Sequence, residues 1–240
     1  AKTISNILDI ELLPINHLEG HILAPGLEDN NLETPYLCLL VSGGHTQIIE
    51  CSDYGSYKIL GETVDDACGE AFDKVGKLLN LDYPGGHKVS KLAADGDPAR
   101  FNFPRALMKD KNLNFSFSGL KTAVLYALED LEEKDYPDVA ASFQEAVVDV
   151  LVKKLAYAIE QTGIKKLVCS GGVAANSLLR ERLTDMGKTS ELEVSYPKME
   201  FCTDNAAMIA YAGFIRKKYN LKDYPTKFAR PRWPLGELYD

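Results

Sequence analysis

Apolar residues recur at helical and strand spacings along most of the chain, and they predict alternating helices and strands. The clearest helical period runs through residues 139–159, where an apolar stripe repeats every three or four positions and Gly163 ends the segment. Continuous or alternating apolar runs predict strands over residues 36–41, 46–51 and 167–169. Further helices are expected over residues 16–24, 65–79, 176–186 and 206–214.

Other segments give weaker signals. Residues 1–13 predict a helical fragment with no capping residue of its own, which runs into a short apolar strand over residues 11–15. The Tyr-Pro-Gly-Gly sequence at 83–86 is expected to end the preceding helical segment. Residues 91–111 are expected to be loop-rich, and residues 114–121 are too short and too punctuated by glycine to assign. The pattern as a whole indicates an α/β protein.

Composition and charge narrow the class of protein. The 240 residues are 45% hydrophobic and carry a net charge of −8, which excludes disordered, collagen-like and coiled-coil chains. No apolar run reaches the roughly 20 residues that cross a bilayer, so no membrane association is expected, and the opening residues lack a signal core. The five cysteines have scattered spacings and are predicted to be reduced and buried.

Two of the four histidines lie four positions apart on a predicted helix. Both rings of His17 and His21 therefore project from one face, at the spacing that a single metal ion needs; the alternative is a pair of surface histidines. A zincin would carry its glutamate directly after the first histidine, whereas Glu19 takes the middle position, which argues against a metalloprotease. Asp204, at a predicted helix start, is a candidate third ligand or a plain helix cap.

Two Ser-Gly-Gly turns, at residues 42–44 and 170–172, each follow an apolar strand. Their bare backbone N–H groups suit phosphate oxygens, although each could be only a tight turn, and the pairing favours a nucleotide held between them. Acidic residues on one helix could contact ribose hydroxyls or a metal, or could be only a solvated face, and an asparagine at a helix start could bind a sugar or cap the helix. These residues are Asp66, Glu70, Asp73 and Asn176.

Basic and aromatic residues alternate near the C-terminal end of an otherwise acidic chain. Such a strip suits RNA backbone and unstacked bases, and its alternative is a solvated helix end and tail. The basic strip comprises Arg216, Lys217, Lys218, Lys222, Lys227, Arg230 and Arg232, interleaved with Tyr219, Tyr224, Phe228 and Trp233.

Six ordered motifs run through nearly the whole chain: HLEGH at 17–21, LVSGGHT at 40–46, GETVDDACGEAFDK at 61–74, FSFSGLK at 115–121, SGGVAAN at 170–176 and CTDN at 202–205. Together they resemble the tRNA N6-adenosine threonylcarbamoyltransferase family, whose members were formerly labelled O-sialoglycoprotein endopeptidases. The resemblance implies an α/β fold of the actin-like ATPase (ribonuclease H-like) superfamily, with two lobes around a nucleotide cleft.

The resemblance also implies a domain organisation. Members of the family begin with an amino-terminal lobe that carries an Ile-Glu-Thr-Ser-Cys-like motif, and this chain begins inside that lobe, so a fragment is expected. Residues 1–33 are then a remnant of the amino-terminal lobe with a metal-binding helix. Residues 34–203 form the C-terminal actin-like lobe, and residues 204–240 form the metal-ligand helix and the tail.

The implied reaction transfers a threonylcarbamoyl group from threonylcarbamoyl-adenylate to N6 of the adenosine beside the anticodon in tRNAs that read ANN codons. The implied ligands of an Fe²⁺ ion, with zinc possible, are His17, His21 and Asp204. The implied substrate contacts are Leu40, Val41, Ser42, Gly43, Gly44, Asp73, Gly86 and Asn176, and Ser90 falls near another such position. No catalytic side chain is implied, because the metal would act as a Lewis acid, AMP would leave and the tRNA amine would attack.

The implied partners are tRNA, threonylcarbamoyl-adenylate and other subunits of the tRNA-modification machinery, with a homodimer possible. The implied location is the cytoplasm, with the mitochondrion as the alternative. Three rival functions stay open: a metal-dependent glycoprotein endopeptidase, another ATP-using enzyme of the same fold such as a sugar or carboxylate kinase, and an inactive assembly scaffold.

Overall fold

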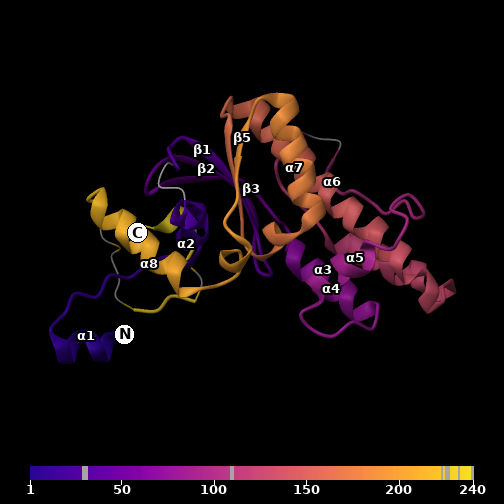
Figure 1. The fold of residues 1–240 in the computed structure, drawn as a ribbon, viewed down its shortest axis with the longest axis horizontal. Helices are drawn as coiled ribbons and strands as arrows, with labels where there is room; N and C mark the ends of the chain where they lie inside the picture. The colour runs from indigo at the N-terminus through magenta and orange to yellow at the C-terminus, as the bar shows by residue number, and fades with distance from the viewer. Residues whose placement is uncertain (29–31, 109–110, 223, 225–227, 232, 239–240) are drawn as a thin grey trace.

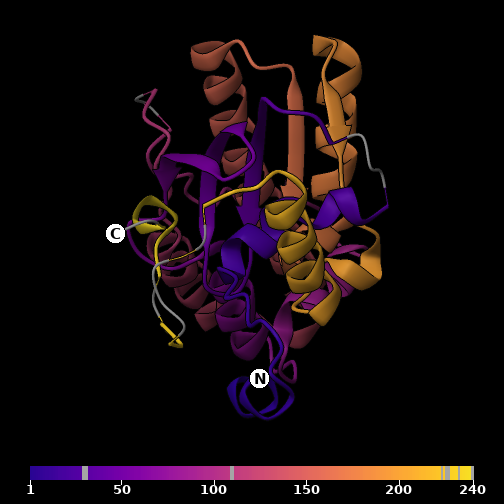
Figure 2. The same cartoon turned by 90° about the vertical axis from the view of Figure 1, so that its left-hand side faces the viewer.

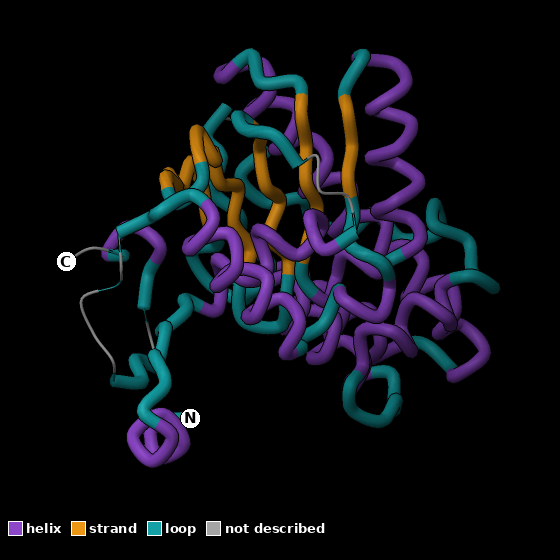
Figure 3. The backbone as a smooth tube through the Cα atoms, turned by 60° about the vertical axis from the view of Figure 1, so that its left-hand side comes forward, coloured by secondary structure: helices purple, strands orange, loops and turns teal. Residues whose placement is uncertain are grey.

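A single mixed β-sheet forms the centre of the protein (Figure 1). The computed structural model describes residues 1–28, 32–108, 111–222, 224, 228–231 and 233–238. The strands of this part of the chain are β1 (Tyr36–Val41), β2 (Thr46–Asp53), β3 (Ser56–Glu62), β4 (Lys166–Ser170) and β5 (Glu193–Ser195), in the order β3-β2-β1-β4-β5. β1 pairs antiparallel with β2 and parallel with β4, so the strand pairing changes from antiparallel to parallel at the central strand. Figure 3 shows the strands side by side with helices around them.

Helices cover both faces of this sheet (Figures 1 and 2). They are α2 (His17–Leu23), α3 (Cys68–Leu78), α4 (Gly85–Ala93), α5 (Ser118–Ala127), α6 (Tyr136–Thr162), α7 (Ser177–Ser190) and α8 (Ala206–Lys218), whereas α1 (Lys2–Leu8) has no buried residue and lies apart from the sheet. Short 3₁₀ turns lie at Ala24–Leu27, Leu128–Asp130, Glu133–Asp135, Gly172–Ala175, Met199–Phe201 and Leu235–Glu237. Leu37 and Leu39 of β1 join the large core with α3 to α7, whereas Cys38 and Leu40 join a second core with α2 and the chain end. This alternation is the period of two that a strand buried on both faces requires.

The strongest sequence patterns are confirmed. The long apolar stripe lies on α6, and Gly163 ends that helix with a φ of 70°, in the left-handed region that favours glycine. Asn16 caps α2, because its Oδ1 accepts a hydrogen bond from the Leu18 N–H at 2.9 Å. Asn176 caps α7 in the same way through the Leu179 N–H at 3.0 Å.

The edges of the sheet differ from the expectation. Residues 11–15 form no strand; Ile15 packs instead against a small cluster that contains Leu23 and Ala212. A strand that the sequence did not predict, β3, follows a turn at Gly55. β3 is an edge strand whose residues are mostly exposed or half-buried, so it lacks the apolar run that marks β1.

Helix α4 was not predicted because the glycines expected to end a helix begin one. Pro84 has an extended backbone and precedes the first turn, where a missing N–H costs nothing. A Cβ on Gly76 of α3 would lie 2.8 Å from the Cα of Gly85, so these glycines let the two helices approach closely. The Pro-Gly-Gly sequence that is expected to end a helix therefore marks the place where α3 and α4 cross.

Helix α5 depends on a cap from a distant part of the chain. The Asp65 carboxylate accepts hydrogen bonds from the backbone N–H groups of Phe117 (2.8 Å) and Ser118 (3.3 Å), and from the hydroxyls of Ser116 (2.6 Å) and Ser118 (2.7 Å). Because the cap lies more than fifty residues before the helix, local sequence could not reveal where α5 begins.

We expect Asp65→Ala to lower the free energy of unfolding by roughly 2 to 3 kcal/mol at pH 7, because several N–H and O–H donors lose a charged acceptor. Burial opposes ionisation of Asp65, but the hydrogen bonds prevail and lower its pKa below 3.8. This stabilisation is therefore present above about pH 4 and is lost as the pH falls through the folded-state pKa. Urea unfolding of the wild-type protein and of Asp65→Ala at pH 7 and at pH 3 measures this stabilisation. An equal loss of unfolding free energy at both pH values would contradict a role for the ionised carboxylate. Asp82→Ala, at an exposed carboxylate paired with Lys88, is the control.

The expectation of buried, reduced cysteines is confirmed. All five cysteines are free thiols and lie in the interior. Burial raises the pKa of Cys169 to about 12, so this thiol stays protonated at neutral pH. Among the described helices, none combines the length and the apolarity needed to cross a bilayer.

Candidate metal centre and nucleotide cavity

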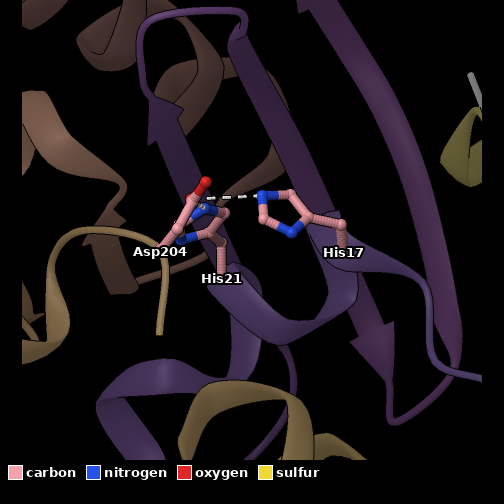
Figure 4. A group of neighbouring side chains, drawn as sticks. All are labelled: His17, His21 and Asp204. Atoms are coloured by element: carbon pink, nitrogen blue, oxygen red, sulfur yellow. Dashed lines mark hydrogen bonds and ion pairs between the residues drawn. The ribbon is translucent and has the colours of Figure 1, made fainter. Parts of the chain in front are cut away.

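Two histidines and one aspartate converge at the start of α8 (Figure 4). His17 and His21 lie one turn apart on α2, and their Nε2 atoms lie 3.2 and 3.0 Å from Oδ1 of Asp204. The potential ligand atoms all lie within 4.8 Å of one another. Asp204 is 183 positions from His21, so the four-residue spacing of the histidines alone could not complete the cluster.

Asp204 is not the cap of α8. Its neighbour Asn205 fills that role, because the Asn205 Oδ1 accepts a hydrogen bond from the Met208 N–H at 2.9 Å. The Asp204 carboxylate can therefore face the histidines while the helix start remains satisfied.

Burial lowers the pKa of two histidines in this region, His21 and His45. Burial lowers the pKa of His21, the neighbouring His17 acts in the same direction, and the Asp204 carboxylate opposes both. A neutral imidazole at physiological pH is the form that binds a metal ion. Burial likewise lowers the pKa of half-buried His45, with His17 and Asp204 among the charges that influence it. The sequence did not single out His45, because its neighbourhood with α2 arises only on folding.

The donor set fits a divalent transition metal. Nitrogen and oxygen ligands bound at about 2.1 Å lie roughly 3.0 to 3.4 Å apart, and the two distances to Asp204 match that range, whereas the set as a whole spreads over up to 4.8 Å, so a small side-chain shift accompanies binding of an ion. Two imidazoles and one carboxylate are typical of non-haem iron and catalytic zinc sites, which keep positions open for water or substrate. In addition, the buried Nδ1 of His21 has no hydrogen-bond partner among the described residues.

A cavity of about 580 Å³ lies beside this cluster. Its wall includes Gly43 and Gly172, one from each Ser-Gly-Gly turn, and Thr203, the residue before Asp204. The volume is within the range of small-molecule sites in proteins. The cavity and the metal cluster are therefore neighbours in the fold.

The two turns meet because their strands are neighbours. β1 and β4 run parallel with Leu40 opposite Ser170, so both turns leave the same edge of the sheet. Ligands of open α/β sheets bind at such carboxyl ends. Gly171 has a φ of 95°, and a Cβ there would lie 2.4 Å from the Val41 carbonyl oxygen, so only glycine fits this turn.

Several of the expected substrate residues line the cavity: Gly43, Asp73, Gly86, Ser90 and Asn176. The Asp73 Oδ1 accepts hydrogen bonds from the N–H groups of Gly85 (2.8 Å) and Gly86 (3.1 Å). The Asn176 side chain caps α7 and also donates to Ser90 and to Gln144. Of the two roles weighed for Asn176, the helix cap is present, and its contact with Ser90 stiffens the wall.

The remaining expected contacts lie around the first turn. Leu40 and Val41 are fully buried in β1 and do not line the cavity. The Ser42 Oγ accepts a hydrogen bond from the His45 N–H, which closes the turn. A Cβ on Gly43 or Gly44 would meet nothing within 4 Å, so both glycines border open space.

Two further sets of charged residues, for which the sequence left alternatives open, have structural roles. Asp66 and Glu70 both pair with Lys74, at 2.7 and 3.0 Å, and neither belongs to the cavity wall.

Arg216 is only 1% exposed and pairs with Glu19, so it cannot contact RNA, and the prediction of a basic strip is wrong at this position. Two further members of the strip, Lys227 and Arg232, lie outside the described residues.

Comparison with known proteins places these features in context. A family model described as tRNA N6-adenosine threonylcarbamoyltransferase, TsaD, matches residues 1–211. Full-length HypF in its phosphate- and nucleotide-bound form is 17% identical, with a TM-score of 0.70 over 90% of this chain and 37% of that chain. HypF of T. kodakarensis is also 17% identical, with a TM-score of 0.69 over 92% and 38%. Component A of the Acidaminococcus fermentans (R)-2-hydroxyglutaryl-CoA dehydratase is 16% identical, with a TM-score of 0.51 over 87% and 70%.

These similarities to solved structures show the fold alone. The expected α/β fold is confirmed, and it is similar to the folds of HypF and of the dehydratase component. The chain spans less than two fifths of the length of the HypF chains that it matches.

Proposed function

The chain belongs to the tRNA N6-adenosine threonylcarbamoyltransferase family, and from that premise we propose that it transfers the threonylcarbamoyl group of threonylcarbamoyl-adenylate to N6 of the adenosine beside the anticodon in tRNAs that read ANN codons. The match over residues 1–211 supports a transferase that modifies tRNA. The observation that carries the specific reaction is that Asp204 of the His17, His21 and Asp204 cluster directly follows Thr203, a residue in the wall of a nucleotide-sized cavity.

The cavity is proposed to hold the adenylate. The open backbone at Gly43 and at Gly172 offers N–H groups to the phosphate oxygens, as glycine-rich turns do at the ends of strands. Asp73 holds the start of α4 through the Gly85 and Gly86 N–H groups, so the wall that faces the nucleoside is fixed before the ligand binds. A preformed wall lowers the entropic cost of binding.

His17, His21 and Asp204 are proposed to hold Fe²⁺, or Zn²⁺, at the end of the cavity nearest Thr203. When bound, such an ion supplies Lewis-acid polarisation of the carbamoyl-phosphate unit. The tRNA amine forms the new C–N bond and gives up one proton to solvent, and the bond between the carbamoyl carbon and the phosphate oxygen breaks as AMP leaves. The chain's own contribution is to orient the two substrates, so this proposal needs no nucleophilic side chain.

The environment of Glu19 bears on the endopeptidase alternative. Its carboxylate has no exposed surface and is ion-paired with Arg216 at 3.1 Å. A general base must reach the water or proton that it activates, and a buried, paired carboxylate does not. The tRNA reaction is therefore the better-supported function.

A transfer assay tests this proposal. The protein is mixed with threonylcarbamoyl-adenylate that is isotope-labelled in its threonine part, with unmodified tRNA, and with a cell extract depleted of the endogenous enzyme as a source of partner subunits. We expect label in a tRNA that has adenosine beside the anticodon and none in a matched tRNA with guanosine there. Absence of label from both tRNAs would reject the reaction, and would favour the scaffold alternative if the protein still assembles with subunits from the extract.

A further inference from the structure

A buried ion pair joins the helix that carries the two histidines to the helix that follows Asp204. We infer that Glu19 is a positioning residue: by pairing with Arg216 it fixes α2 along α8, and so holds His17 and His21 opposite Asp204. This inference rests on the proposed function, because it concerns the same metal centre. It assigns a task to the central residue of the HLEGH motif, whose side chain is not among the metal ligands.

The position of Glu19 on α2 separates it from the ligand face. Each helical residue advances about 100°, so a residue two positions from both histidines lies on the opposite side of α2 from them. There the Glu19 carboxylate accepts hydrogen bonds from Arg216 Nη1, at 3.1 Å to Oε1 and 3.3 Å to Oε2. It also accepts one from the Tyr57 hydroxyl at 3.0 Å and one from the Tyr224 hydroxyl. Asn16 and Glu19 have the spacing of a capping box, but the glutamate carboxylate makes these contacts instead.

Arg216 connects this network to α8. It lies in the last turn of that helix, and its guanidinium stacks 3.8 Å from the ring centre of Tyr224 and donates to the Lys222 carbonyl oxygen. The helix begins two residues after Asp204, and ten residues of α-helix span about 15 Å. Arg216 thus anchors the far end of the rigid element whose near end follows the aspartate.

A second contact fixes the near end. A Cβ on Gly20 would lie 3.0 Å from Ile209 Cδ1 and 3.3 Å from Met208 Cγ, so α2 and α8 approach closely at this glycine. Close packing at Gly20 and the ion pair at Glu19 hold the two helices at two separate points. Two points of attachment define the axial position of α2 against α8, which a single apolar contact leaves free to slide.

The chemistry of the pair favours a role in specificity. Burying two charges costs desolvation, and an apolar pair of similar volume is often at least as stabilising, whereas an unpaired buried charge is strongly destabilising. Only the correct axial register of α2 and α8 satisfies both Glu19 and Arg216, which are 0% and 1% exposed. The metal ligands depend on that same register, and partners that orient ligands typically change metal affinity by about 10- to 100-fold when removed.

The test is Glu19→Gln, which keeps the shape of the side chain and removes its charge. We expect the dissociation constant for Co²⁺, measured by competition with a chromophoric chelator, to rise by about 10- to 100-fold. We also expect the visible absorption band of the bound Co²⁺ to change, which a uniform loss of stability does not produce. Tyr224→Phe, a milder change that removes one hydroxyl from Glu19, should shift both quantities in the same direction by less, and it decides the question if Glu19→Gln does not fold.

Lys154→Met is the matched control. Lys154 is also fully buried and donates to backbone oxygens, but it lies on α6, in the core on the other face of the sheet. We expect it to lower thermal stability without changing Co²⁺ affinity. If the wild-type protein binds Co²⁺, two outcomes would overturn the inference. One is unchanged Co²⁺ affinity and spectrum in Glu19→Gln, and the other is an equal loss of Co²⁺ affinity in Lys154→Met. Failure of the wild-type protein to bind Co²⁺ would instead reject the metal centre itself, and the inference with it.

Discussion

Asp204→Ala should reduce the bound iron or zinc from about one ion per chain to a small fraction of that, and should lower threonylcarbamoyl transfer about a thousandfold. Asp204 supplies the Oδ1 atom that lies 3.2 and 3.0 Å from the two imidazoles, and is the one anionic ligand of the cluster. Without it, two imidazoles remain, and His17 is half exposed to water. A thousandfold loss corresponds to about 4 kcal/mol of transition-state stabilisation, the scale on which a Lewis acid acts.

Elemental analysis of protein purified without chelator, together with the transfer assay, measures both effects. The matched control is Asp185→Ala, which removes an exposed carboxylate from α7 that pairs with Lys188 and should leave metal content and transfer unchanged. His87→Ala is a second control for metal content, because His87 lies on α4 and not in the cluster. Wild-type metal content in Asp204→Ala would mean that the cluster is not the metal site.

The candidate metal centre shows how far local sequence reaches. The spacing of His17 and His21 places both on one face of a helix, and this part of the site follows from helical geometry alone. The contact of His21 with Asp204 joins residues that are 183 positions apart, and it depends on how α2 packs on α8. No period in the sequence encodes that packing, so local sequence left Asp204 open between a third ligand and a helix cap, and only the resemblance of the motifs to a known family favoured the ligand.

At Arg216 in the basic strip, the local sequence predicts the wrong environment. Arg216 follows the apolar face of α8 and is succeeded by two lysines, so its sequence context indicates a solvated helix end. Its partner Glu19 lies 197 positions earlier, and the pair is buried where α2 and Tyr224 pack against α8. Charge patterns describe a surface only where tertiary packing leaves it exposed.

The fold follows the same rule. The long stripe of α6 and the apolar run of β1 are predicted correctly because burial on a whole face imposes a period on the sequence. The edge strand β3 lies against a single neighbour and carries no such period. Helix α4 begins at glycines, one of which packs closely against Gly76 of α3. The rule that such glycines end a helix therefore fails here.

Gly86→Leu should weaken AMP binding about a hundredfold without weakening the fold. Gly86 lies in the first turn of α4 and lines the cavity, and a Cβ there meets only the Phe72 Cβ, at an ordinary 3.7 Å. The backbone therefore accepts a side chain, which has to project toward the space proposed for the nucleoside. Leucine favours a helix over glycine by up to about 1 kcal/mol, so stability should hold or rise. A hundredfold loss of affinity corresponds to about 2.7 kcal/mol.

Calorimetric titration with AMP and thermal unfolding separate these two effects, because a damaged fold would lower both affinity and stability together. Gly119→Leu is the matched control: Gly119 also lies in the first turn of a helix, α5, and a Cβ there meets nothing within 4 Å, but the residue is not part of the cavity wall. Its AMP affinity should equal that of the wild-type protein. Equal AMP affinity in Gly86→Leu and in Gly119→Leu would mean that the nucleotide binds elsewhere, and that the cavity has no part in the proposed reaction. The metal centre is tested independently by Asp204→Ala.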